Sequence, residues 1–401
     1  MILTWTNEII SYGTSPCLDP LSKSCQRNNM HSKPLKIGII GGGQLARMLL
    51  IKCQQLGLHT SILSGSKLDP AAQITNEWHC GDVNDLATLK SFLEKLDFAT
   101  FESEFLDSEK LQLAGQFSQT KLFPDPKTMG RLQNRKTQKA LLDEFKIEVA
   151  PWIFVEHEFQ AQEILATLNS KLILKKCRFG YDGYGTFVIH SAEQLQPIFK
   201  NPSADGYIAE AKINFKRELA FMMARDQFNN IVSLPLVESF QKNAKCLWIK
   251  GPVHHKGFKK LEKQLKKMLS KLNYVGIMGV ELFDCGNYLM VNELAPRVHN
   301  SGHYSSDALV HDQFLLHVMA VAGLKLPKLV SQKSKGFAMH NLLGENWSAK
   351  WAEYDLYFHW YGKSEVKPGR KMGHITALDN SPETALQKLL NAKRRVSMES
   401  K

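Results

Sequence analysis

The chain has no long apolar run, although 43% of its 401 residues are hydrophobic. A membrane-spanning helix needs about 20 consecutive apolar residues, so we expect no part of the chain to lie in a membrane. The N-terminal string MILTWTNEII has no basic residue before its short apolar stretch, which argues against a secretory signal. The length exceeds that of one small core and predicts two or three domains.

Paired cysteines are also missing, because the seven cysteines are odd in number and form no CxxC motif. Disulfide frameworks use even sets of cysteines, and structural zinc sites use closely spaced pairs. The cysteine pattern therefore argues against both and is typical of a protein from a reducing compartment. We expect the protein to be cytoplasmic.

Acidic residues are outnumbered, 39 against 51 Lys and Arg, which gives a net charge of +12. Such an excess can indicate nucleic-acid binding, since clustered cations attract phosphate backbones. Much of it lies in KGFKKLEKQLKKMLSKL, residues 256–272, where apolar residues recur at helical spacing: Phe258, Leu261, Leu265, Met268 and Leu272. A solvated amphipathic helix explains this stretch without a nucleic-acid partner. The positive field would also suit phosphorylated small substrates.

The first part of the chain predicts an α/β fold with a parallel, doubly wound sheet. Residues 1–33 show no period and are read as a disordered extension or a mis-called start, with Met30 as an alternative start. From Lys36 the strings KIGIIGGG, QLARMLLIKCQQLG, HTSILS, DLATLKSFLEKL and FATFES alternate between strand and helix. This β-α-β-α-β order over residues 36–125 is typical of a parallel sheet.

The rest of the chain predicts two further units. A helix, LQNRKTQKALLDEF, and the Pro-containing APWIFV mark a change of unit, and strands then surround the glycine-rich RFGYDGYGT. A hairpin follows in VGIMGVELFDCGNYLMVNEL. We expect an N-terminal domain over residues 34–133, a middle domain over 134–330 with a small subdomain at about 150–212, and a C-terminal domain over 331–401.

The turn GGGQLA, Gly41 to Ala46, is the first candidate site. It follows a strand and opens a helix, whose backbone amides could hold a phosphate. However, the second strand ends in Ser64 and Gly65, where an Asp or Glu that binds a ribose is expected. An NAD-dependent oxidoreductase is therefore disfavoured, and tight-turn glycines without a ligand are an equally good interpretation.

The second candidate site combines Lys139 and Lys175 with the glycine-rich loop from Arg178 to Thr186. Glycines let backbone amides approach phosphate oxygens, and lysines neutralise phosphate charge. The loop is not a Walker A motif, but such a lid would suit a nucleotide triphosphate. Taken alone, a surface glycine loop is the simpler interpretation.

The third candidate site is VNELAPRVHNSGHY, residues 291–304, together with Glu281. The Gly286–Asn287 turn would put Glu281 opposite Asn292, so Glu293 converges on Glu281 only through a bulge or a twisted strand end. Two carboxylates and an amide without thiols suit Mg²⁺ that bridges nucleotide phosphates. The alternative is a structural salt bridge between Glu293 and Arg297.

These motifs, in this order, resemble the ATP-grasp superfamily and, more closely, the 5-(carboxyamino)imidazole ribonucleotide synthases. The strings that carry the resemblance are IGIIGGGQLARML, RLQNRKTQKALL, GYDGYG, NELAPRVHNSGH and WYGKSEVKPGRKMGHIT. The resemblance implies an ATP-grasp fold with a Rossmann-like pre-ATP-grasp domain and a small β-rich C-terminal domain. It implies an ATP-dependent carbon–nitrogen ligase of purine biosynthesis, which carboxylates aminoimidazole ribonucleotide with bicarbonate through carboxyphosphate. It also implies a homodimer.

The resemblance assigns roles to individual positions. Those that would contact ATP are Arg135, Lys175, Gly180, Tyr181, Gly183, Glu210, Ile213, Glu218, Gln241, Asn292 and Glu293. Glu281 and Glu293 would hold Mg²⁺ or Mn²⁺. The catalytic set would be Arg297, His299, Asn300 and Asp182, with Arg297 stabilising the charge of carboxyphosphate. The ribonucleotide pocket would comprise Gly43, Gln44, Leu45, Glu102 (or Glu104), Tyr181, Asp182, Lys363, Arg370 and Lys371. For His303 and Tyr304 we expect structural roles.

The chain departs from the family pattern in the glycine loop, where Phe179, Tyr184 and Thr186 replace a glycine, an arginine and a glutamine. Gln241 stands where a histidine is common, Ser364 is inserted, and Lys367 replaces an arginine. A Tyr supplies one hydroxyl donor in place of a guanidinium. These changes motivate an alternative: a diverged ATP-grasp paralogue that binds nucleotide or joins another carboxylate and amine.

Overall fold

The structure is a computed structural model that describes residues 34–168, 171–180 and 183–399. The residues from Pro34 onward form one compact unit, so the division into three domains stays a prediction. The expected disorder of residues 1–33 concerns residues outside the described part. Among the described helices, none has the length and apolar character that crossing a membrane requires.

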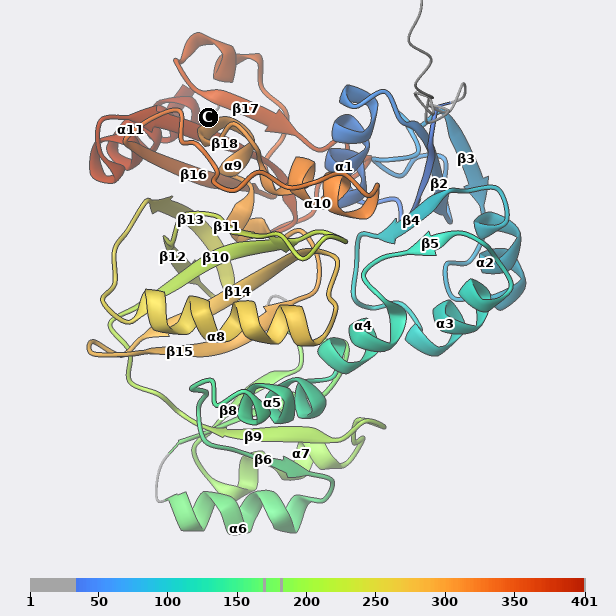
Figure 1. Ribbon diagram of the computed structural model, residues 1–401. Helices are drawn as coiled ribbons and strands as arrows, with labels where there is room; N and C mark the ends of the chain where they lie inside the picture. The colour runs from blue at the N-terminus through green and yellow to red at the C-terminus, as the bar shows by residue number, and fades with distance from the viewer. Residues whose placement is uncertain (1–33, 169–170, 181–182, 400–401) are drawn as a thin grey trace, which may run out of the picture. The chain divides into compact units, whose positions relative to one another are not determined.

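The N-terminal part is a five-stranded parallel sheet in the order β3-β2-β1-β4-β5 (Figure 1). Its strands are β1 (Lys36–Ile40), β2 (His59–Ser64), β3 (Glu77–Cys80), β4 (Phe98–Phe101) and β5 (Lys121–Leu122). Its helices are α1 (Gln44–Gln55), α2 (Leu86–Leu93) and α3 (Ser108–Gln116). The doubly wound prediction is confirmed. It missed β3, whose residues EWHC form no apolar run and lie only partly buried at the sheet edge.

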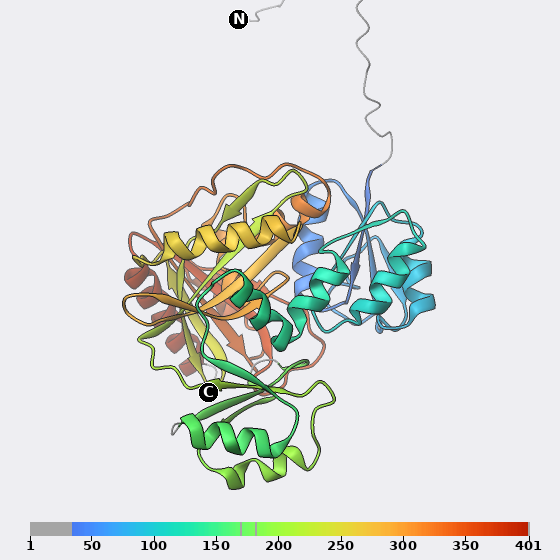
Figure 2. The same cartoon turned by 60° about the horizontal axis from the view of Figure 1, so that its bottom comes forward.

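A four-stranded antiparallel sheet forms the small subdomain, in the order β6-β9-β7-β8. Its strands are β6 (Trp152–Val155), β7 (Leu172–Lys176), β8 (Thr186–Ile189) and β9 (Tyr207–Ala211). Figure 2 shows α6 (Glu158–Leu168) and α7 (Gln196–Phe199), which follows the short η1 (Ala192–Gln194), on one face of this sheet. Apolar residues of that face form a separate small core.

A nine-stranded sheet runs from the middle of the chain into its C-terminal part. The order is β15-β14-β10-β12-β13-β16-β18-β17, and β11 pairs with β10. The strands are β10 (Arg217–Arg225), β11 (Ile231–Ser233), β12 (Val237–Lys242), β13 (Lys245–Gly251), β14 (Gly276–Asp284), β15 (Leu289–Ala295), β16 (Gly336–Leu343), β17 (Tyr357–Trp360) and β18 (Lys371–Asp379). Because β13 pairs with β16, the C-terminal strands continue the middle sheet.

The remaining helices are α4 (Pro126–Gln133), α5 (Arg135–Glu144), α8 (Phe258–Lys271), η2 (Asn300–Gly302), α9 (Ser305–Ala308), α10 (Gln313–Val321), η3 (Ala349–Glu353) and α11 (Pro382–Glu399). The amphipathic helix at α8 is confirmed, since Leu261, Leu265 and Met268 are buried. The prediction of one helix through LQNRKTQKALLDEF is wrong. The chain breaks at Asn134, which adopts an extended conformation and caps α5 by accepting from the Lys136 amide.

His317 of α10 joins the parallel sheet to the large sheet inside the protein. Its Nδ1 accepts from the backbone amide of Ile277 on β14 at 3.1 Å. The other ring nitrogen, Nε2, therefore carries the proton and donates to Thr100 Oγ1 of β4 at 2.8 Å. Burial lowers the pKa of His317 to about 4, so the ring is neutral at pH 7.

This contact predicts a pH-dependent stability. The folded pKa of about 4 lies below the ordinary 6.5, so the unfolded chain binds the proton more readily as the pH falls between those values. As the pH falls from 6.5 to 4, protonation of His317 in the unfolded chain should therefore lower the free energy of unfolding by on the order of 3 kcal/mol. His317→Leu should be less stable at pH 7 by about 1–3 kcal/mol, because the Ile277 amide loses its acceptor.

Urea unfolding at several pH values would test this, with the exposed His190→Leu as control. The stability deficit of His317→Leu should shrink as the pH approaches 4, while the control stays parallel to the wild type. A deficit that stays constant with pH would contradict the assignment.

Candidate functional site

The hairpin of β14 and β15 brings two carboxylates to one place through an irregularity in its pairing. Glu281 lies opposite Glu293, whereas the next pair is Leu282 with Val291, so Asn292 is the extra residue of a β-bulge. With strict alternation Glu281 would lie opposite Asn292, and Glu293 would point to the other face of the sheet. The extra residue shifts the pairing by one position, so that Glu281 and Glu293 lie opposite each other. The predicted bulge is therefore present. Asn292 Nδ2 donates to Glu281 Oε2 at 3.3 Å.

The carboxylates at this bulge repel one another. Burial, together with the negative charges of Glu293 and Glu218, raises the pKa of Glu281 to about 7. Burial raises the pKa of Glu218 as well, although a hydrogen bond with Gln241 opposes the shift. A divalent cation would relieve this repulsion. The donors are all oxygen atoms, which is the ligand set that Mg²⁺ and Mn²⁺ take.

A buried group of opposite charges lies beside the bulge. Glu210 of β9 contacts Lys139 Nζ at 2.8 Å and Lys175 Nζ at 2.5 Å. Both lysines reach the bulge, because Lys139 Nζ donates to the Asn292 carbonyl at 3.2 Å and Lys175 Nζ donates to Asn292 Oδ1 at 3.1 Å. Burial alone would raise the pKa of Glu210, but the two lysines lower it to about 2. The lysines are thus held where they face the carboxylates of β14 and β15.

Arg135, at the start of α5, joins the second carboxylate to the glycine loop. Its Nη2 contacts Glu293 Oε2 at 3.0 Å, and its Nη1 donates to the Lys176 carbonyl at 3.1 Å. The loop packs closely on this guanidinium, since a Cβ on Gly180 would lie 2.7 Å from Arg135 Nη1. Gly180 is therefore needed for close approach.

Phe179, which stands where the family pattern has a glycine, takes a backbone conformation that glycine favours. Its φ is +61°, in the left-handed region that costs a residue with a side chain about 1–2 kcal/mol. The ring is half exposed, and it lies 6.2 Å from the ring of Phe105. The departure from the family pattern thus places a bulky side chain at a strained backbone position.

Arg297 is held by Glu104. Its Nη2 lies 2.9 Å from Glu104 Oε1, and its Nε contacts the other carboxylate oxygen. The alternative interpretation, a structural pair between Arg297 and Glu293, is wrong, because Glu293 pairs with Arg135 instead. Arg297 is thus oriented by a residue that follows β4, far away in the sequence.

His299 follows Arg297 and is positioned by Gln313 of α10. The backbone amide of His299 donates to Gln313 Oε1 at 2.9 Å, and Gln313 Nε2 donates to the His299 carbonyl at 2.8 Å. The His299 Nδ1 accepts from the Ser301 amide, so Nε2 carries the proton and lies 3.5 Å from Glu281 Oε1. Burial and the neighbouring Arg297 hold the pKa of His299 well below its ordinary value.

The GGGQLA turn binds an internal carboxylate. Glu102 accepts from the amides of Gly43 at 2.6 Å and Ala46 at 3.0 Å, at the N-terminus of α1. An external phosphate would find these two amides occupied, so the phosphate role suggested for this turn is not supported. Burial raises the pKa of Glu102, and the two amide hydrogen bonds oppose that shift.

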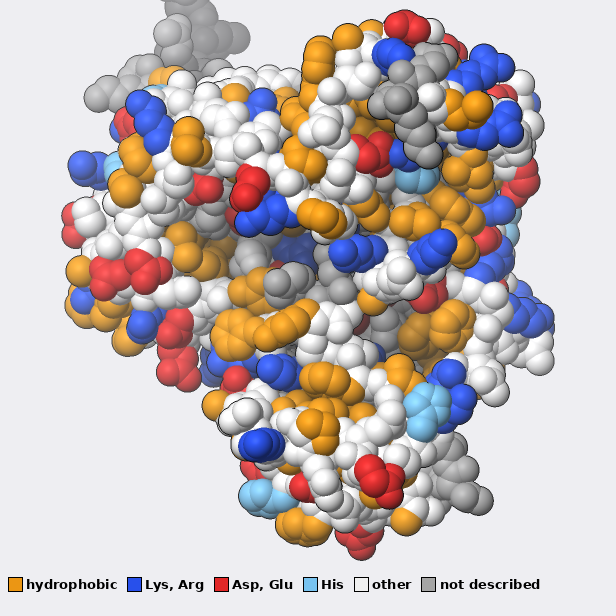
Figure 3. Space-filling view, turned by 180° about the vertical axis from the view of Figure 1, so that it is seen from behind, with side chains coloured by type: hydrophobic (Ala, Val, Ile, Leu, Met, Phe, Trp, Pro, Cys, Tyr) orange, Lys and Arg blue, Asp and Glu red, His pale blue; other side chains and the backbone are white. Residues whose placement is uncertain are grey.

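A cavity of about 600 Å³ unites most of the expected residues. Figure 3 shows the face of the molecule that is hollowed, with Lys and Arg side chains in the depression. The expected residues that line the cavity are Gly43, Gln44, Leu45, Glu102, Arg135, Lys175, Gly180, Gly183, Glu210, Ile213, Glu218, Gln241, Glu281, Asn292, Glu293, Arg297, His299, Asn300 and Lys371. The three candidate sites therefore form one site.

Four expected residues stand apart from this set. Lys363 and Arg370 do not line the cavity as the described residues form it, since Arg370 Nη1 donates to the Glu365 carbonyl of its own turn at 2.8 Å and Lys363 Nζ lies 5.9 Å from the Tyr361 ring. Tyr181 and Asp182 lie outside the described residues. Their substrate roles stay predictions.

Several residues that position this site were missed. Gln313 and Asn341 are fully buried and bind the 299–300 segment. Glu104 was named only as an alternative to Glu102, yet it binds Arg297. Each contact joins elements far apart in the sequence, and only a pattern of buried polar residues on apolar strands and helices could have indicated them. Tyr304 has the structural role expected, since its hydroxyl donates to the Pro235 carbonyl and its ring stacks on Phe337.

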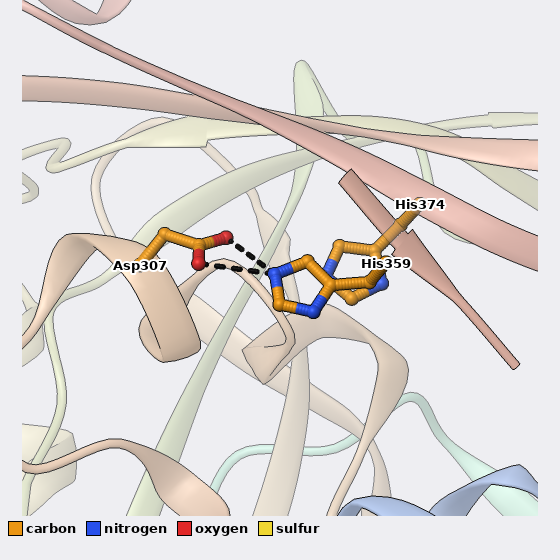
Figure 4. Close-up of side chains that lie close together, drawn as sticks. All are labelled: Asp307, His359 and His374. Atoms are coloured by element: carbon orange, nitrogen blue, oxygen red, sulfur yellow. Dashed lines mark hydrogen bonds and ion pairs between the residues drawn. The ribbon is translucent and has the colours of Figure 1, made fainter. Parts of the chain in front are cut away.

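Asp307, His359 and His374 form a second polar cluster beside the cavity (Figure 4). Their donor atoms lie within 4.8 Å of one another, and His359 Nε2 contacts both Asp307 oxygens at 3.0 Å. The two rings stack at 4.4 Å between centroids with 8° between planes. A metal ion binds in the plane of each imidazole, so two stacked rings cannot both point a lone pair at one ion. The cluster is better described as a hydrogen bond between Asp307 and His359 that supports a ring stack.

Comparisons with known proteins agree with this geometry. Three family models match the chain: a ribonucleotide synthetase preATP-grasp domain over residues 35–133, an ATP-grasp domain over 140–314, and a phosphoribosylaminoimidazole carboxylase C-terminal domain over 338–388. The expected ATP-grasp fold is therefore confirmed.

Relatives and solved structures cover nearly the same span. An N5-carboxyaminoimidazole ribonucleotide synthase of Synechococcus elongatus is 35% identical, over 85% of this chain and 88% of the relative. The N5-carboxyaminoimidazole synthetase of Staphylococcus aureus complexed with ADP has a TM-score of 0.84 at 31% identity, over 91% and 99% of the two chains. The Aspergillus clavatus synthase in complex with ADP and 5-aminoimidazole ribonucleotide has a TM-score of 0.80 at 27% identity, over 90% and 99%.

The buried charges around Glu210 predict a large effect on stability. Glu210→Gln would leave Lys139 charged and buried without its anion, which should cost about 3 kcal/mol of unfolding free energy. Adding Lys139→Met in the same chain should recover part of that loss, because the uncompensated cation is removed.

Urea unfolding of the single and double variants would measure both effects, with the exposed Glu156→Gln as the matched control. A Glu210→Gln variant as stable as the control would show that the ion pair of Glu210 with Lys139 contributes nothing to the free energy of unfolding.

Proposed function

Because the chain belongs to the family of N5-carboxyaminoimidazole ribonucleotide synthases, we infer that it is an ATP-dependent ligase that carboxylates 5-aminoimidazole ribonucleotide. ATP is the co-substrate, and bicarbonate supplies the carboxyl group through carboxyphosphate. The observation that carries this function is the single cavity in which the carboxylate pair, the buried lysines and the Arg297–His299 segment face one another. Phosphoryl transfer and carboxylation need these groups within one enclosed space.

Glu281 and Glu293 would hold Mg²⁺ or Mn²⁺, with Asn292 beside them. Two facing carboxylates at a bulge, with the pKa of Glu281 raised by burial and by its acidic neighbours, fit a divalent cation. Such an ion would supply positive charge that neutralises the phosphate oxygens. The protein's part is to keep the two carboxylates together, which the extra residue in β15 does.

ATP would lie between the small sheet and the large sheet. Lys175 and Arg135 are the cations in reach of phosphate oxygens, and both are already oriented by Glu210 and Glu293. We assign the remaining ATP contacts to Gly180, Gly183, Ile213, Glu218 and Gln241, which line the cavity, and to Tyr181. Preorganised cations need no rearrangement when the phosphates bind.

The carboxyl group would be transferred at the Arg297–Asn300 segment. Arg297 is the permanent cation there, and Glu104 fixes its plane. His299 is neutral and directs its Nε2–H toward Glu281, so it can donate a hydrogen bond without adding charge. Asn300 and Asp182 complete the proposed catalytic set. Gly43, Gln44, Leu45, Glu102, Lys363, Arg370 and Lys371, with Tyr181 and Asp182, would bind the ribonucleotide.

We further propose that the enzyme works as a cytoplasmic homodimer. Unpaired cysteines favour a reducing compartment, and the family resemblance supports the dimer. No nucleic-acid or membrane partner is proposed. The lysines of α8 belong to an amphipathic helix whose apolar face is buried, which accounts for much of the positive charge.

The altered loop supports a second candidate, a diverged paralogue that binds nucleotide or ligates another substrate pair. ADP release measured with and without aminoimidazole ribonucleotide, in the presence of bicarbonate, separates the two. Release that the ribonucleotide stimulates at least tenfold supports the synthase, whereas equal release in both assays supports the paralogue. Phe179 keeps a left-handed backbone conformation that a glycine would adopt readily, which favours the synthase.

Removing one carboxylate of the pair should abolish turnover without unfolding the protein. Glu281→Gln and Glu293→Gln should each lower kcat by 100-fold or more, because the divalent ion loses a charged ligand. Calorimetry of ADP binding should show that Mg²⁺ no longer strengthens binding in either variant. Near-normal turnover in both variants would refute the assignment, and thermal unfolding close to wild type is the control for folding.

Arg297→Ala should separate nucleotide binding from carboxylation. Carboxylated product should fall by 100-fold or more, since the developing charge of carboxyphosphate loses its cation, while ADP affinity changes by less than about threefold. Glu104 would be left buried without a partner, so Arg297→Lys serves as the milder companion variant. Full product formation by Arg297→Ala would contradict the role.

A further inference from the structure

The segment that follows His299 is bound along one side by the C-terminal strands. Asn300, His303 and Asp307 are spaced by three and four residues, so they share one face of the short helices η2 and α9. Each meets a different C-terminal partner: Asn300 meets Asn341, His303 meets Tyr361 at 3.0 Å, and Asp307 meets His359 at 3.0 Å. The position of this segment therefore depends on β16, on β17 and on Tyr361, which follows β17.

The backbone carbonyl of Cys246 on β13 sets the direction of the first contact. A carbonyl can only accept, so the Asn341 atom that lies 3.0 Å from it is the amide nitrogen Nδ2. Asn341 and Asn300 then form a reciprocal amide pair, with Asn341 Nδ2 donating to Asn300 Oδ1 at 2.8 Å and Asn300 Nδ2 donating to Asn341 Oδ1 at 2.9 Å. The Cys246 carbonyl therefore determines the orientation of both side-chain amides, Asn341 directly and Asn300 through Asn341.

The same chain of contacts selects one tautomer of His303. The second hydrogen of Asn300 Nδ2 faces His303 Nδ1 at 3.5 Å, and that nitrogen can accept it only with a free lone pair. Tyr361 Oη also lies 3.0 Å from His303 Nδ1, and 2.8 Å from His374 Nδ1 on its other side. With the Asn300 amide and the Tyr361 hydroxyl as donors, His303 Nδ1 is the acceptor and the ring proton is on Nε2.

The other ring nitrogen of His303, Nε2, is buried without a hydrogen-bond partner among the described residues. His303 is fully buried and lines the cavity, as Lys371 and Arg297 do. Buried N–H groups almost always have an acceptor, so an N–H without one beside a ligand cavity points to a ligand. Burial and the nearby Lys371 lower the pKa of His303 to about 3, so the ring stays neutral.

We propose that Asn341, oriented by the Cys246 carbonyl, acts through Asn300 as a positioning residue that fixes His303 as the Nε2–H tautomer, and that this N–H donates a hydrogen bond to an anionic oxygen of a bound substrate. The inference rests on the proposed function for the identity of the substrates. The oxygen belongs either to the carboxyl group being transferred or to the ribonucleotide phosphate. His303, for which a structural role was expected, thereby becomes a binding residue.

A matched pair of variants tests the donor, since Gln places an amide near the position of Nε2 whereas Asn places one near Nδ1. In steady-state assays His303→Gln should keep kcat/KM within about tenfold of the wild type, and His303→Asn should lose 100-fold or more. A rise in KM for bicarbonate identifies the carboxyl oxygen, and a rise in KM for the ribonucleotide identifies the phosphate. His303→Asn equal to or better than His303→Gln would overturn the donor role.

The tautomer has its own readout, which needs no turnover. Proton–nitrogen correlation spectra of the ¹⁵N-histidine-labelled protein should show His303 as Nε2–H, with its signals assigned by their loss in His303→Gln. Asn341→Leu should raise the Nδ1–H fraction and lower kcat, with ADP affinity unchanged within about threefold. A wild-type Nδ1–H tautomer, or a tautomer that Asn341→Leu leaves unchanged, would overturn the positioning role.

The steady-state assays and the spectra together also separate this inference from the proposed function on which it rests. If the wild type releases no ADP in response to the ribonucleotide, the proposed function fails while the spectra still confirm or contradict the tautomer. If the wild type is active and the tautomer differs, the inference fails alone.

Discussion

The arrangement of the whole site depends on one extra residue, Asn292, in the strand that pairs with β14. Without the bulge, Glu281 would face a different residue and the two carboxylates would not converge. Asn292 also accepts hydrogen bonds from both lysines, through its backbone carbonyl from Lys139 and through its side-chain oxygen from Lys175. The bulge therefore fixes the position of the two lysines relative to the two carboxylates. A two-residue turn at Gly286 and Asn287 fixes where along the hairpin that irregularity lies.

Around this bulge, most charged side chains already have a partner of opposite sign from another element. Arg135 contacts Glu293, Arg297 contacts Glu104, and both lysines contact Glu210. Such pairs hold long, flexible side chains in one orientation before a ligand arrives, which lowers the entropic cost of binding. Glu281 and Glu218 are exceptions, since Glu281 contacts the neutral Asn292 and His299, and Glu218 is hydrogen-bonded to the neutral Gln241. Among the described residues these two carboxylates form no ion pair with a Lys or Arg, which leaves their charge to be neutralised by a ligand.

Local pattern was enough to predict the parallel sheet and the hairpin, because each depends on periodicity or turn chemistry within a short stretch. Most of the site residues were assigned instead by the resemblance to the family. The bulge, or a twisted strand end in its place, could be predicted because Glu293, the neighbour of Asn292, converges on Glu281 only where the strict alternation is broken. Contacts between distant elements could not be predicted, because they leave no local signal in the sequence. Examples are the contact of Glu104 with Arg297 and the contacts of Gln313 and Asn341 with the 299–300 segment. The break at Asn134 was missed for a related reason, since the apolar period continues through it and only the cap reveals the new helix.

The most direct test is the position of a divalent ion. Crystals grown with ADP and Mn²⁺ would show the ion by its anomalous scattering, independently of any assay. The bulge geometry predicts a peak between the carboxylates of Glu281 and Glu293, with both within bonding distance, and no such peak in Glu281→Gln. A manganese peak bound elsewhere in the cavity, with these two carboxylates still facing each other unligated, would contradict the assignment on which the proposed chemistry depends.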